Sequence, residues 1–279
     1  MSEPARPTQR EYWNSQVGDE WVLHADAIDK MLADLTQAAF APLNLQSGER
    51  VLDIGCGSGA ATLKAAQLVA ASGRATGVDI SRPLLELARR RAKGRGNLAF
   101  FEADAGAADI PGAPFDAAFS RFGVMFFDQP VAAFRNIREA MAPGGRLVFA
   151  SWRPFAENLW TAQPLAALTP MLKEPLKPVD PDLPGPFALS DAGKIHRILD
   201  AAGWRDVSIG RWDGDVVLGA NAREAAAFLL KIGPCARAIN EQGLDAAEVE
   251  RLLLQFLATI EGPKGIARPA ACWIVHASA

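Results

Sequence analysis

The stretch VLDIGCGSG, residues 51–59, combines an acid with closely spaced glycines. Asp53 lies in an apolar run, and Gly55, Gly57 and Gly59 follow at alternate positions. Glycine tolerates a positive φ, and because it lacks a Cβ it lets a ligand approach the backbone closely. Where such a loop opens a helix, the first turn of that helix offers free N–H groups and a positive dipole end. The stretch therefore predicts a binding site for a nucleotide-type ligand.

Two classes of cofactor compete for this loop. The NAD(P) fingerprint, GxGxxG/A, is met by Gly55, Gly57 and Ala60, with Asp79 about twenty residues further on. S-adenosylmethionine (SAM) has no pyrophosphate and carries a positive α-amino group instead. Asp53 suits that amino group, whereas it would repel a pyrophosphate. Tyr12 is the only tyrosine in the chain, so the Tyr-x-x-x-Lys pair of many oxidoreductases is impossible. These residues favour SAM over NAD(P).

Short apolar runs alternate with helical patterns between residues 48 and 152. We predict helices over 60–71, after Ser81 and over 131–141, and strands over 50–54, 74–80, 97–104, 115–122 and 146–152. Such alternation predicts right-handed crossovers and a parallel sheet covered on both faces. In an open sheet of this kind, ligands bind beyond the carboxyl ends of the strands, where the strand order reverses. The glycine loop follows the first of these strands.

The flanking segments depart from this alternation. Apolar residues recur at helical spacing between 10 and 42, and 153–190 is rich in proline, which predicts a long loop with at most a short helix. A helix (191–203) and a strand (205–212) come next, then one or two helices within 222–261 and a final strand (271–278). We therefore expect an N-terminal helical lid (1–44), a cofactor-binding core (45–152), a proline-rich cap loop (153–190), and the end of the core sheet (191–279) with a helical cap insertion at about 222–261.

Composition narrows the class of protein. The chain has 279 residues and a formal net charge of -3, which gives no overall basic field for nucleic acid. Its three cysteines, Cys56, Cys235 and Cys272, form neither a disulfide framework nor a zinc pattern. We expect no signal peptide and no membrane span, because no uncharged apolar run reaches the roughly 20 residues that a span needs. A cytoplasmic protein is expected.

The motifs taken together resemble a known family. Asp-Ile-Gly-Cys-Gly-Ser-Gly, residues 53–59, is similar to the first motif of class I SAM-dependent methyltransferases. The later landmarks follow in order: GVDIS (77–81), EADA (102–105), FDAAFSRFGVMFF (115–127) and APGGRLVF (142–149). The resemblance covers residues 45–152 and is closest to small-molecule methyltransferases of the ubiquinone/menaquinone biosynthesis type. It implies an α/β fold with a doubly wound, Rossmann-like sheet of seven mostly parallel strands, the last one antiparallel.

The resemblance also implies which residues hold the cofactor. The methionine part would lie against Asp53, Gly55, Cys56, Gly57, Gly59 and Thr62. Asp79 would bind the ribose hydroxyls, and Ile80 would pack on the adenine. Asp104 and the backbone of Ala105 would bind the edge of the adenine. Ser120 and Phe122, which leave the fourth strand, would line the methyl-donor end.

The N-terminal segment and the fourth strand supply candidates for the acceptor side. His24 is the candidate general base, with packing as the alternative. Trp13 is suited to hold the sulfonium through cation–π attraction, and Tyr12 to contact the acceptor, although both rings could instead pack the lid onto the core. Arg121 could contact an anionic acceptor or pair with an acid of the lid. The residues leave these alternatives open.

The expected activity is methyl transfer from SAM to a small, largely apolar metabolite, at an O, N or C atom. S-adenosylhomocysteine (SAH) would be the product, and no metal is expected. The motif SRFG lacks the Asn/Asp-Pro-Pro-aromatic pattern of enzymes that methylate nucleobase amino groups. The alternatives are a non-catalytic or non-methylating SAM-binding protein of the same fold and, less favoured, an NAD(P) oxidoreductase. A monomer and a homodimer are both consistent with the sequence.

Overall fold

The computed structural model describes residues 7–176 and 180–279, so residues 1–6 of the predicted lid and 177–179 of the predicted loop lie outside it. Its centre is a seven-stranded sheet in the order β3-β2-β1-β4-β5-β7-β6. The strands are β1 (Arg50–Ile54), β2 (Arg74–Asp79), β3 (Leu98–Glu102), β4 (Phe115–Arg121), β5 (Met141–Trp152), β6 (Arg205–Gly219) and β7 (Ile266–Ser278). Strands β1 to β5 pair in parallel, and β7 is antiparallel to β5 and β6. The predicted fold class is confirmed.

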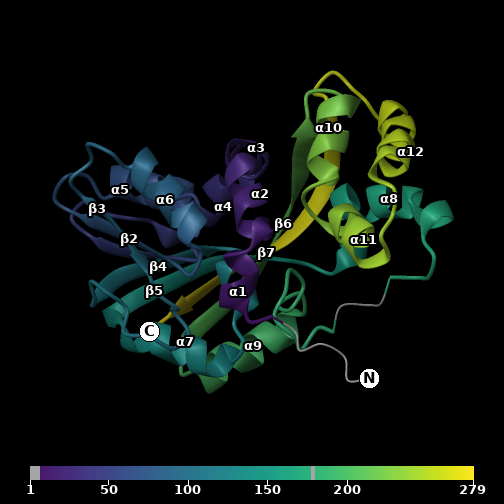
Figure 1. Ribbon diagram of the computed structural model, residues 1–279. Helices are drawn as coiled ribbons and strands as arrows, with labels where there is room; N and C mark the ends of the chain where they lie inside the picture. The colour runs from purple at the N-terminus through teal and green to yellow at the C-terminus, as the bar shows by residue number, and fades with distance from the viewer. Residues whose placement is uncertain (1–6, 177–179) are drawn as a thin grey trace.

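Helices cover both faces of the parallel strands (Figure 1). Helices α4 (Ala33–Leu43) and α5 (Ala60–Leu68) bury their apolar sides on one face, with α6 (Arg82–Arg91) beside them. Helices α7 (Pro130–Glu139) and α9 (Ala192–Ala201) lie on the other face. Four of the five residues of β1 are buried, as expected for a strand enclosed on both faces. The strand order reverses between β1 and β4, which makes their carboxyl ends the expected ligand site.

The N-terminal segment forms four short helices rather than one long one. These are α1 (Gln9–Trp13), α2 (Gln16–Leu23), α3 (Ala25–Met31) and α4. His24 and Leu32 interrupt the series, each ending one helix and starting the next with φ near -100°. Figure 1 shows α1 to α3 standing across the carboxyl edge of the sheet. We call residues 7–32 the lid.

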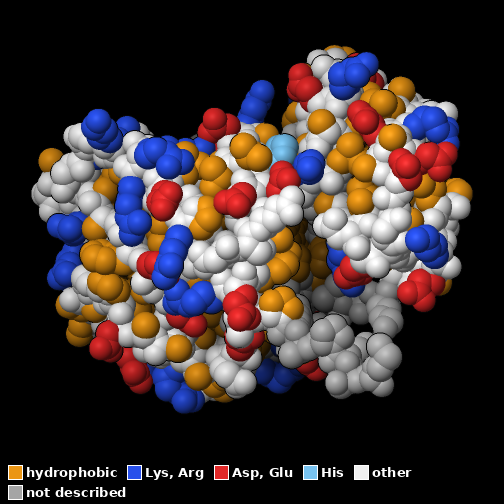
Figure 2. All heavy atoms as spheres, viewed as in Figure 1, with side chains coloured by type: hydrophobic (Ala, Val, Ile, Leu, Met, Phe, Trp, Pro, Cys, Tyr) orange, Lys and Arg blue, Asp and Glu red, His pale blue; other side chains and the backbone are white. Residues whose placement is uncertain are grey.

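A second lobe extends from the sheet (Figure 1). It contains α8 (Leu159–Ala167), α10 (Ala222–Leu229), α11 (Pro234–Gln242) and α12 (Ala246–Ala258), which pack near the distal parts of β6 and β7. We call these helices the cap. Figure 2 shows a notch between the cap and the lobe that holds the parallel strands. On the same face Lys and Arg side chains are mixed with Asp and Glu.

Two expectations for these segments were wrong. The insertion 222–261 holds three helices, because Gly233 and Gly243 adopt positive φ and Pro234 starts a new helix between them. Strands β6 and β7 are also longer than the predicted 205–212 and 271–278, since they continue to pair with each other as far as Gly219 and Ile266. Among the described residues, no helix combines the length and the apolar character that crossing a bilayer requires.

Candidate cofactor and acceptor site

The glycine loop leaves β1 at the point where the strand order reverses. Gly55, Gly57 and Gly59 all have positive φ, between 52° and 81°. A Cβ on Gly55 would lie 2.7 Å from the Cα of Gly123, so the loops after β1 and β4 touch at two glycines. A Cβ on Gly57 would have no atom of the described residues within 4 Å. Gly55 is therefore needed for packing, whereas Gly57 borders open space that suits a ligand.

Asp53 lies next to this loop and is only 2% exposed. Its Oδ2 accepts a hydrogen bond from Thr62 Oγ1 at 2.6 Å. Burial raises the pKa of Asp53 to about 6, although the Thr62 hydrogen bond and the charge of Arg121 both act to lower it. A buried carboxylate of this kind is costly to ionise, and a bound cation would offset that cost.

Asp79 ends the neighbouring strand and contacts the loop directly. Its Oδ2 accepts from the Gly57 N–H at 2.7 Å, and its Oδ1 from the Ser81 N–H at 2.8 Å. Burial raises the pKa of this carboxyl as well. The next residue, Ile80, is tied to the lid because its carbonyl accepts from Asn14 Nδ2 at 2.8 Å. Asp79 therefore joins the glycine loop to the start of α6.

The third acid of the series follows β3. Asp104 is exposed, and its Oδ1 accepts from the Gly106 N–H at 2.8 Å. Ala105 is buried, and its carbonyl accepts from Asn136 Nδ2 at 2.9 Å. Because β1, β2 and β3 are adjacent and parallel, Asp53, Asp79 and Asp104 all lie toward the same edge of the sheet.

Ser120 fixes the turn after β4. It is fully buried, donates to the Ile54 carbonyl at 2.8 Å and accepts from the Gly123 N–H at 3.1 Å. The turn forces Phe122 into the left-handed region, with φ 69°. A non-glycine residue in this region is strained, and such strain collects at functional sites. The Phe122 ring stacks on Trp152, the last residue of β5, at 4.2 Å between centroids.

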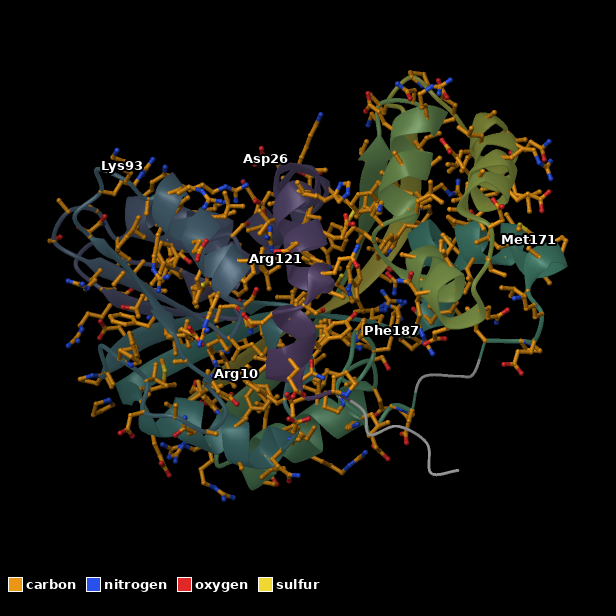
Figure 3. All side chains as sticks on the ribbon, in the orientation of Figure 1. Arg10, Asp26, Lys93, Arg121, Met171 and Phe187 are labelled. Atoms are coloured by element: carbon orange, nitrogen blue, oxygen red, sulfur yellow. The ribbon has the colours of Figure 1, made fainter. Side chains whose placement is uncertain are left out.

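Arg121 pairs with an acid of the lid, one of the two alternatives left open by the sequence. Its Nη2 lies 2.6 Å from Asp29 Oδ1. Asp29 Oδ2 in turn accepts from Arg91 Nη1 at 2.8 Å and from Ser58 Oγ at 3.2 Å. Figure 3 shows Arg121 beside the lid helices. Asp29 therefore connects the lid to β4, to α6 and to the glycine loop.

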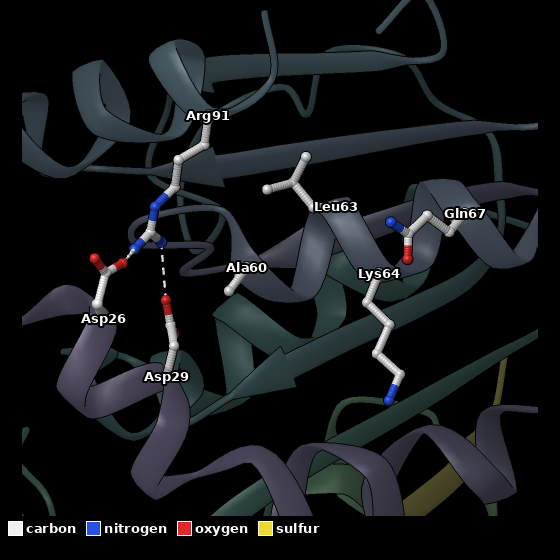
Figure 4. A pocket seen from close by; sticks show the side chains of 7 residues that line it. All are labelled: Asp26, Asp29, Ala60, Leu63, Lys64, Gln67 and Arg91. Atoms are coloured by element: carbon white, nitrogen blue, oxygen red, sulfur yellow. Dashed lines mark hydrogen bonds and ion pairs between the residues drawn. The ribbon is translucent and has the colours of Figure 1, made fainter.

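Figure 4 shows the outer side of this network, where Arg91 reaches toward Asp26 and Asp29. The three residues border a surface cavity of about 530 Å³ that continues along α5 past Lys64. Sequence reasoning did not identify Asp29 or Arg91 as parts of the site. No local signal set them apart, because Asp26 and Lys30 flank Asp29, and Arg91 belongs to a run of three arginines.

Aromatic rings pack the lid against the loop after β4. The Trp13 ring makes edge-to-face contacts with Tyr12, Trp21 and Phe126, at 5.2 to 5.5 Å between centroids. The Trp13 carbonyl also accepts from Ser81 Oγ at 3.0 Å. Trp13 therefore lies in the contact between the lid and the core, whereas Tyr12 is 41% exposed and packs on the Trp13 ring. Contacts of either ring with a ligand stay a prediction.

His24 lies between α2 and α3. Its Nε2 is 3.8 Å from Glu20 Oε2, and its ring packs edge-to-face on Phe228 of α10, at 5.9 Å between centroids. These contacts join the lid to the cap, and a role as general base stays a prediction. Cys56 is buried as a free thiol, and burial raises its pKa. Within the described residues, no group of three or more His, Cys, Asp or Glu side chains is placed to hold a metal ion.

Comparison with known proteins finds a family match over part of this chain. Residues 51–145 match a family described as a methyltransferase domain. Aklanonic acid methyltransferase of Streptomyces sp. strain C5 is 37% identical over 107 residues, which are 38% of this chain and 49% of that protein. Demethylmenaquinone methyltransferase of Thermus thermophilus is 36% identical over 107 residues, 38% of this chain and 48% of that protein. The chain thus spans about half the length of these curated relatives.

Solved structures match over almost the whole chain. A Haemonchus contortus phosphoethanolamine N-methyltransferase, in complex with phosphomonomethylethanolamine and SAH, has a TM-score of 0.60 at 16% identity and covers 99% of this chain and 61% of that one. The [4+2]-cyclase SpnF has a TM-score of 0.54 at 20% identity, and covers 99% of this chain and 97% of that one. At these identities the likeness concerns the fold. Residues 51–145 of the chain thus match a methyltransferase domain, within a fold that the chain shares with a solved N-methyltransferase.

Proposed function

We propose that this chain is a SAM-dependent methyltransferase that acts on a small, largely apolar metabolite. One arrangement carries the proposal: the buried Asp53 lies next to a glycine loop with open space at Gly57, and Asp79 accepts a hydrogen bond from that same loop. The match of residues 51–145 to a methyltransferase domain supports it.

The residues present fit SAM better than NAD(P). Asp53 would pair with the α-amino group, and that pairing would offset the cost of holding a buried carboxylate. Each oxygen of Asp79 accepts one backbone N–H, which leaves acceptor capacity on both oxygens for the two ribose hydroxyls. A pyrophosphate next to Asp53 would bring like charges together. SAM supplies a methyl group already activated on a sulfonium.

The chain's own contribution would then be mainly positional. Holding donor and acceptor in line can lower a barrier by about 7–11 kcal/mol. The lid is held over the site through Asp29 and through the Trp13 contacts, and it would exclude water while the two molecules react. A hydroxyl or carbon acceptor would also need a base, for which His24 stays our candidate. Asp104 and Ala105 would bind the edge of the adenine beyond Asp79.

The acceptor class rests on charge and on the relatives. The net charge of -3 and the mixed charges in Figure 2 offer no extended basic surface for nucleic acid on that face. The two relatives are named for aklanonic acid and for demethylmenaquinone, which are small molecules. A small metabolite held between the lid, the cap and the carboxyl edge of the sheet is consistent with both observations.

A second candidate has a specific observation in its favour. The match with SpnF extends over 97% of the SpnF chain, and SpnF is described as a [4+2]-cyclase. This fold therefore also supports a reaction other than methyl transfer. A protein that binds SAM or SAH without transferring the methyl group would share the cofactor residues named above.

Calorimetric titration of the full chain with SAM, SAH and NADH tests the proposal. We expect micromolar binding of both adenosyl compounds and no binding of NADH. Binding of NADH alone would refute the assignment of the loop. Release of SAH during incubation of the protein with SAM and a panel of hydroxylated ring compounds would then separate a methyltransferase from a protein that only binds the cofactor.

A further inference from the structure

The side chain of Asn14, which lies between α1 and α2 of the lid, bonds to two backbone groups that follow β2. Its Nδ2 donates to the Ile80 carbonyl at 2.8 Å, and its Oδ1 accepts from the Arg82 N–H at 2.9 Å. The same Nδ2 also donates to the Arg10 carbonyl of α1 at 2.8 Å, so both hydrogens of the amide and its oxygen are engaged. Asn14 therefore joins the lid to the residues that come directly after Asp79.

These bonds cap helix α6 from the lid. Ser81 is the N-cap residue of α6, and its side chain makes no capping hydrogen bond. The Ser81 hydroxyl donates instead to the Trp13 carbonyl of the lid at 3.0 Å. The first N–H groups of a helix have no partner within the helix, and the Asn14 oxygen accepts from the first of them, the N–H of Arg82. The lid therefore supplies a cap that the N-cap side chain of α6 does not.

Gly18 of α2 allows the lid to come this close. It is buried, and a Cβ at this position would lie 2.2 Å from the Trp13 carbonyl oxygen and 3.4 Å from Ser81 Oγ. Glycine is a poor helix former, so the contact explains its place in α2 better than the helix does. The packing of the lid thus favours the same junction as the hydrogen bonds of Asn14.

One peptide group links Asn14 to Asp79. A peptide group is planar, so the directions of its carbonyl and its N–H are fixed relative to each other. The group between Ile80 and Ser81 accepts from Asn14 through its carbonyl. Its N–H donates to Asp79 Oδ1 at 2.8 Å. Asn14 therefore orients one of the two N–H groups, those of Ser81 and Gly57, that hold the Asp79 carboxylate.

We propose that Asn14 is a positioning residue for the adenosine end of the cofactor. It orients the peptide group between Ile80 and Ser81, and through that group it turns the Asp79 carboxylate toward the ribose. The ribose hydroxyls would donate to the remaining lone pairs of Asp79, and hydrogen bonds weaken steeply when their angles depart from the preferred range. This inference rests on the proposed function. It adds a residue through which the lid sets cofactor affinity by acting on Asp79, besides covering the site.

Calorimetric titration of the full chain with SAH tests the role of Asn14. The Asn14 side chain is exposed, so Asn14→Ala leaves no cavity in the core. We expect this variant to bind SAH about 3- to 10-fold more weakly, the effect of one neutral hydrogen bond. Asn97→Ala is the matched control. Asn97 Nδ2 also donates to two backbone carbonyls, those of Ala66 at 2.8 Å and Ala70 at 2.9 Å, but Asn97 precedes β3 and so lies at the opposite edge of the sheet. We expect Asn97→Ala to leave SAH affinity unchanged.

A double-mutant cycle separates positioning of Asp79 from simple covering of the site. Asp79→Ala removes the carboxylate that Asn14 is proposed to orient. Adding Asn14→Ala to Asp79→Ala should therefore weaken SAH binding by less than about 2-fold. A full 3- to 10-fold loss in that background would show that Asn14 acts independently of Asp79, and would overturn the inference. If thermal unfolding shows that Asp79→Ala is not folded, Asp79→Asn replaces it, and the loss on adding Asn14→Ala should again be smaller than in the native chain.

The outcomes distinguish the inference from the proposed function. If SAH does not bind the native chain, the proposed function fails and this inference fails with it. If SAH binds the native chain and Asn14→Ala equally well, or if Asn97→Ala weakens binding as much as Asn14→Ala does, only the role of Asn14 is refuted. Should Asn14→Ala not fold, Asn14→Asp takes its place with the same expectations, because it keeps an oxygen for the Arg82 N–H and loses the donor to Ile80.

Discussion

Replacing Asp53 by Asn should stabilise the protein while weakening cofactor binding. Burial raises the pKa of Asp53 from 3.8 to about 6. The Asp53 carboxyl group therefore holds its proton more tightly in the folded protein than in the unfolded chain. The native protein therefore loses stability as the pH rises from about 4 to about 6, by about 3 kcal/mol in total. The Asp53→Asn variant has no proton to lose. Its stability relative to the native protein should rise by about 1–1.5 kcal/mol between pH 5 and pH 7.5.

Urea unfolding of both proteins at pH 5 and pH 7.5, at equal ionic strength, measures this difference. SAH titration of the same samples should show that the variant loses about 1.5–3 kcal/mol of binding free energy, the value of a charge-assisted hydrogen bond. Thr62→Val is the paired control, and it should lower the free energy of unfolding where Asp53→Asn raises it. Without the Thr62 hydrogen bond the pKa of Asp53 rises further, so this variant should be less stable than the native protein, and more so at pH 7.5 than at pH 5. A stability gap for Asp53→Asn that is the same at both pH values would refute the reasoning.

Four further substitutions test other parts of the site. Asp79→Ala should weaken SAH binding by about 1–3 kcal/mol in calorimetry, and an unchanged affinity would remove the ribose assignment. Gly55→Ala places a methyl group 2.7 Å from the Gly123 Cα and should lower the free energy of unfolding by about 1–3 kcal/mol. Gly57→Ala meets open space and bears only the strain of a positive φ, which Gly55→Ala bears as well, so its loss of stability should be smaller. A loss as large as that of Gly55→Ala would contradict our interpretation of the loop. Asp29→Asn removes the charge that pairs with Arg91 and Arg121, and should speed amide hydrogen exchange in α2 and α3 while leaving β1 to β5 unchanged. Equal exchange in the native and variant lids would show that Asp29 does not hold the lid.

Local sequence patterns were enough to predict the strands in the parallel half of the sheet. The runs that became β1, β2, β3 and β4 are each predicted within about two residues of their observed bounds, because a strand buried on both faces needs a short continuous apolar run. The predicted helix 131–141 ends at Glu139, since Met141 already pairs with Phe115 at the start of β5. Pairing with a distant strand decided that boundary.

The sequence by itself determined the fold class, the glycine loop and the acids near the carboxyl ends of the first three strands, because each depends on residues that are neighbours in the chain. Only the tertiary structure revealed that Asp29 pairs with Arg121, that Gly123 touches Gly55, and that Asn14 of the lid bonds to the Ile80 carbonyl. Each of these depends on segments that are far apart in sequence and meet at one edge of the sheet. The free energy of such contacts comes from burial and charge that exist only after the chain has folded.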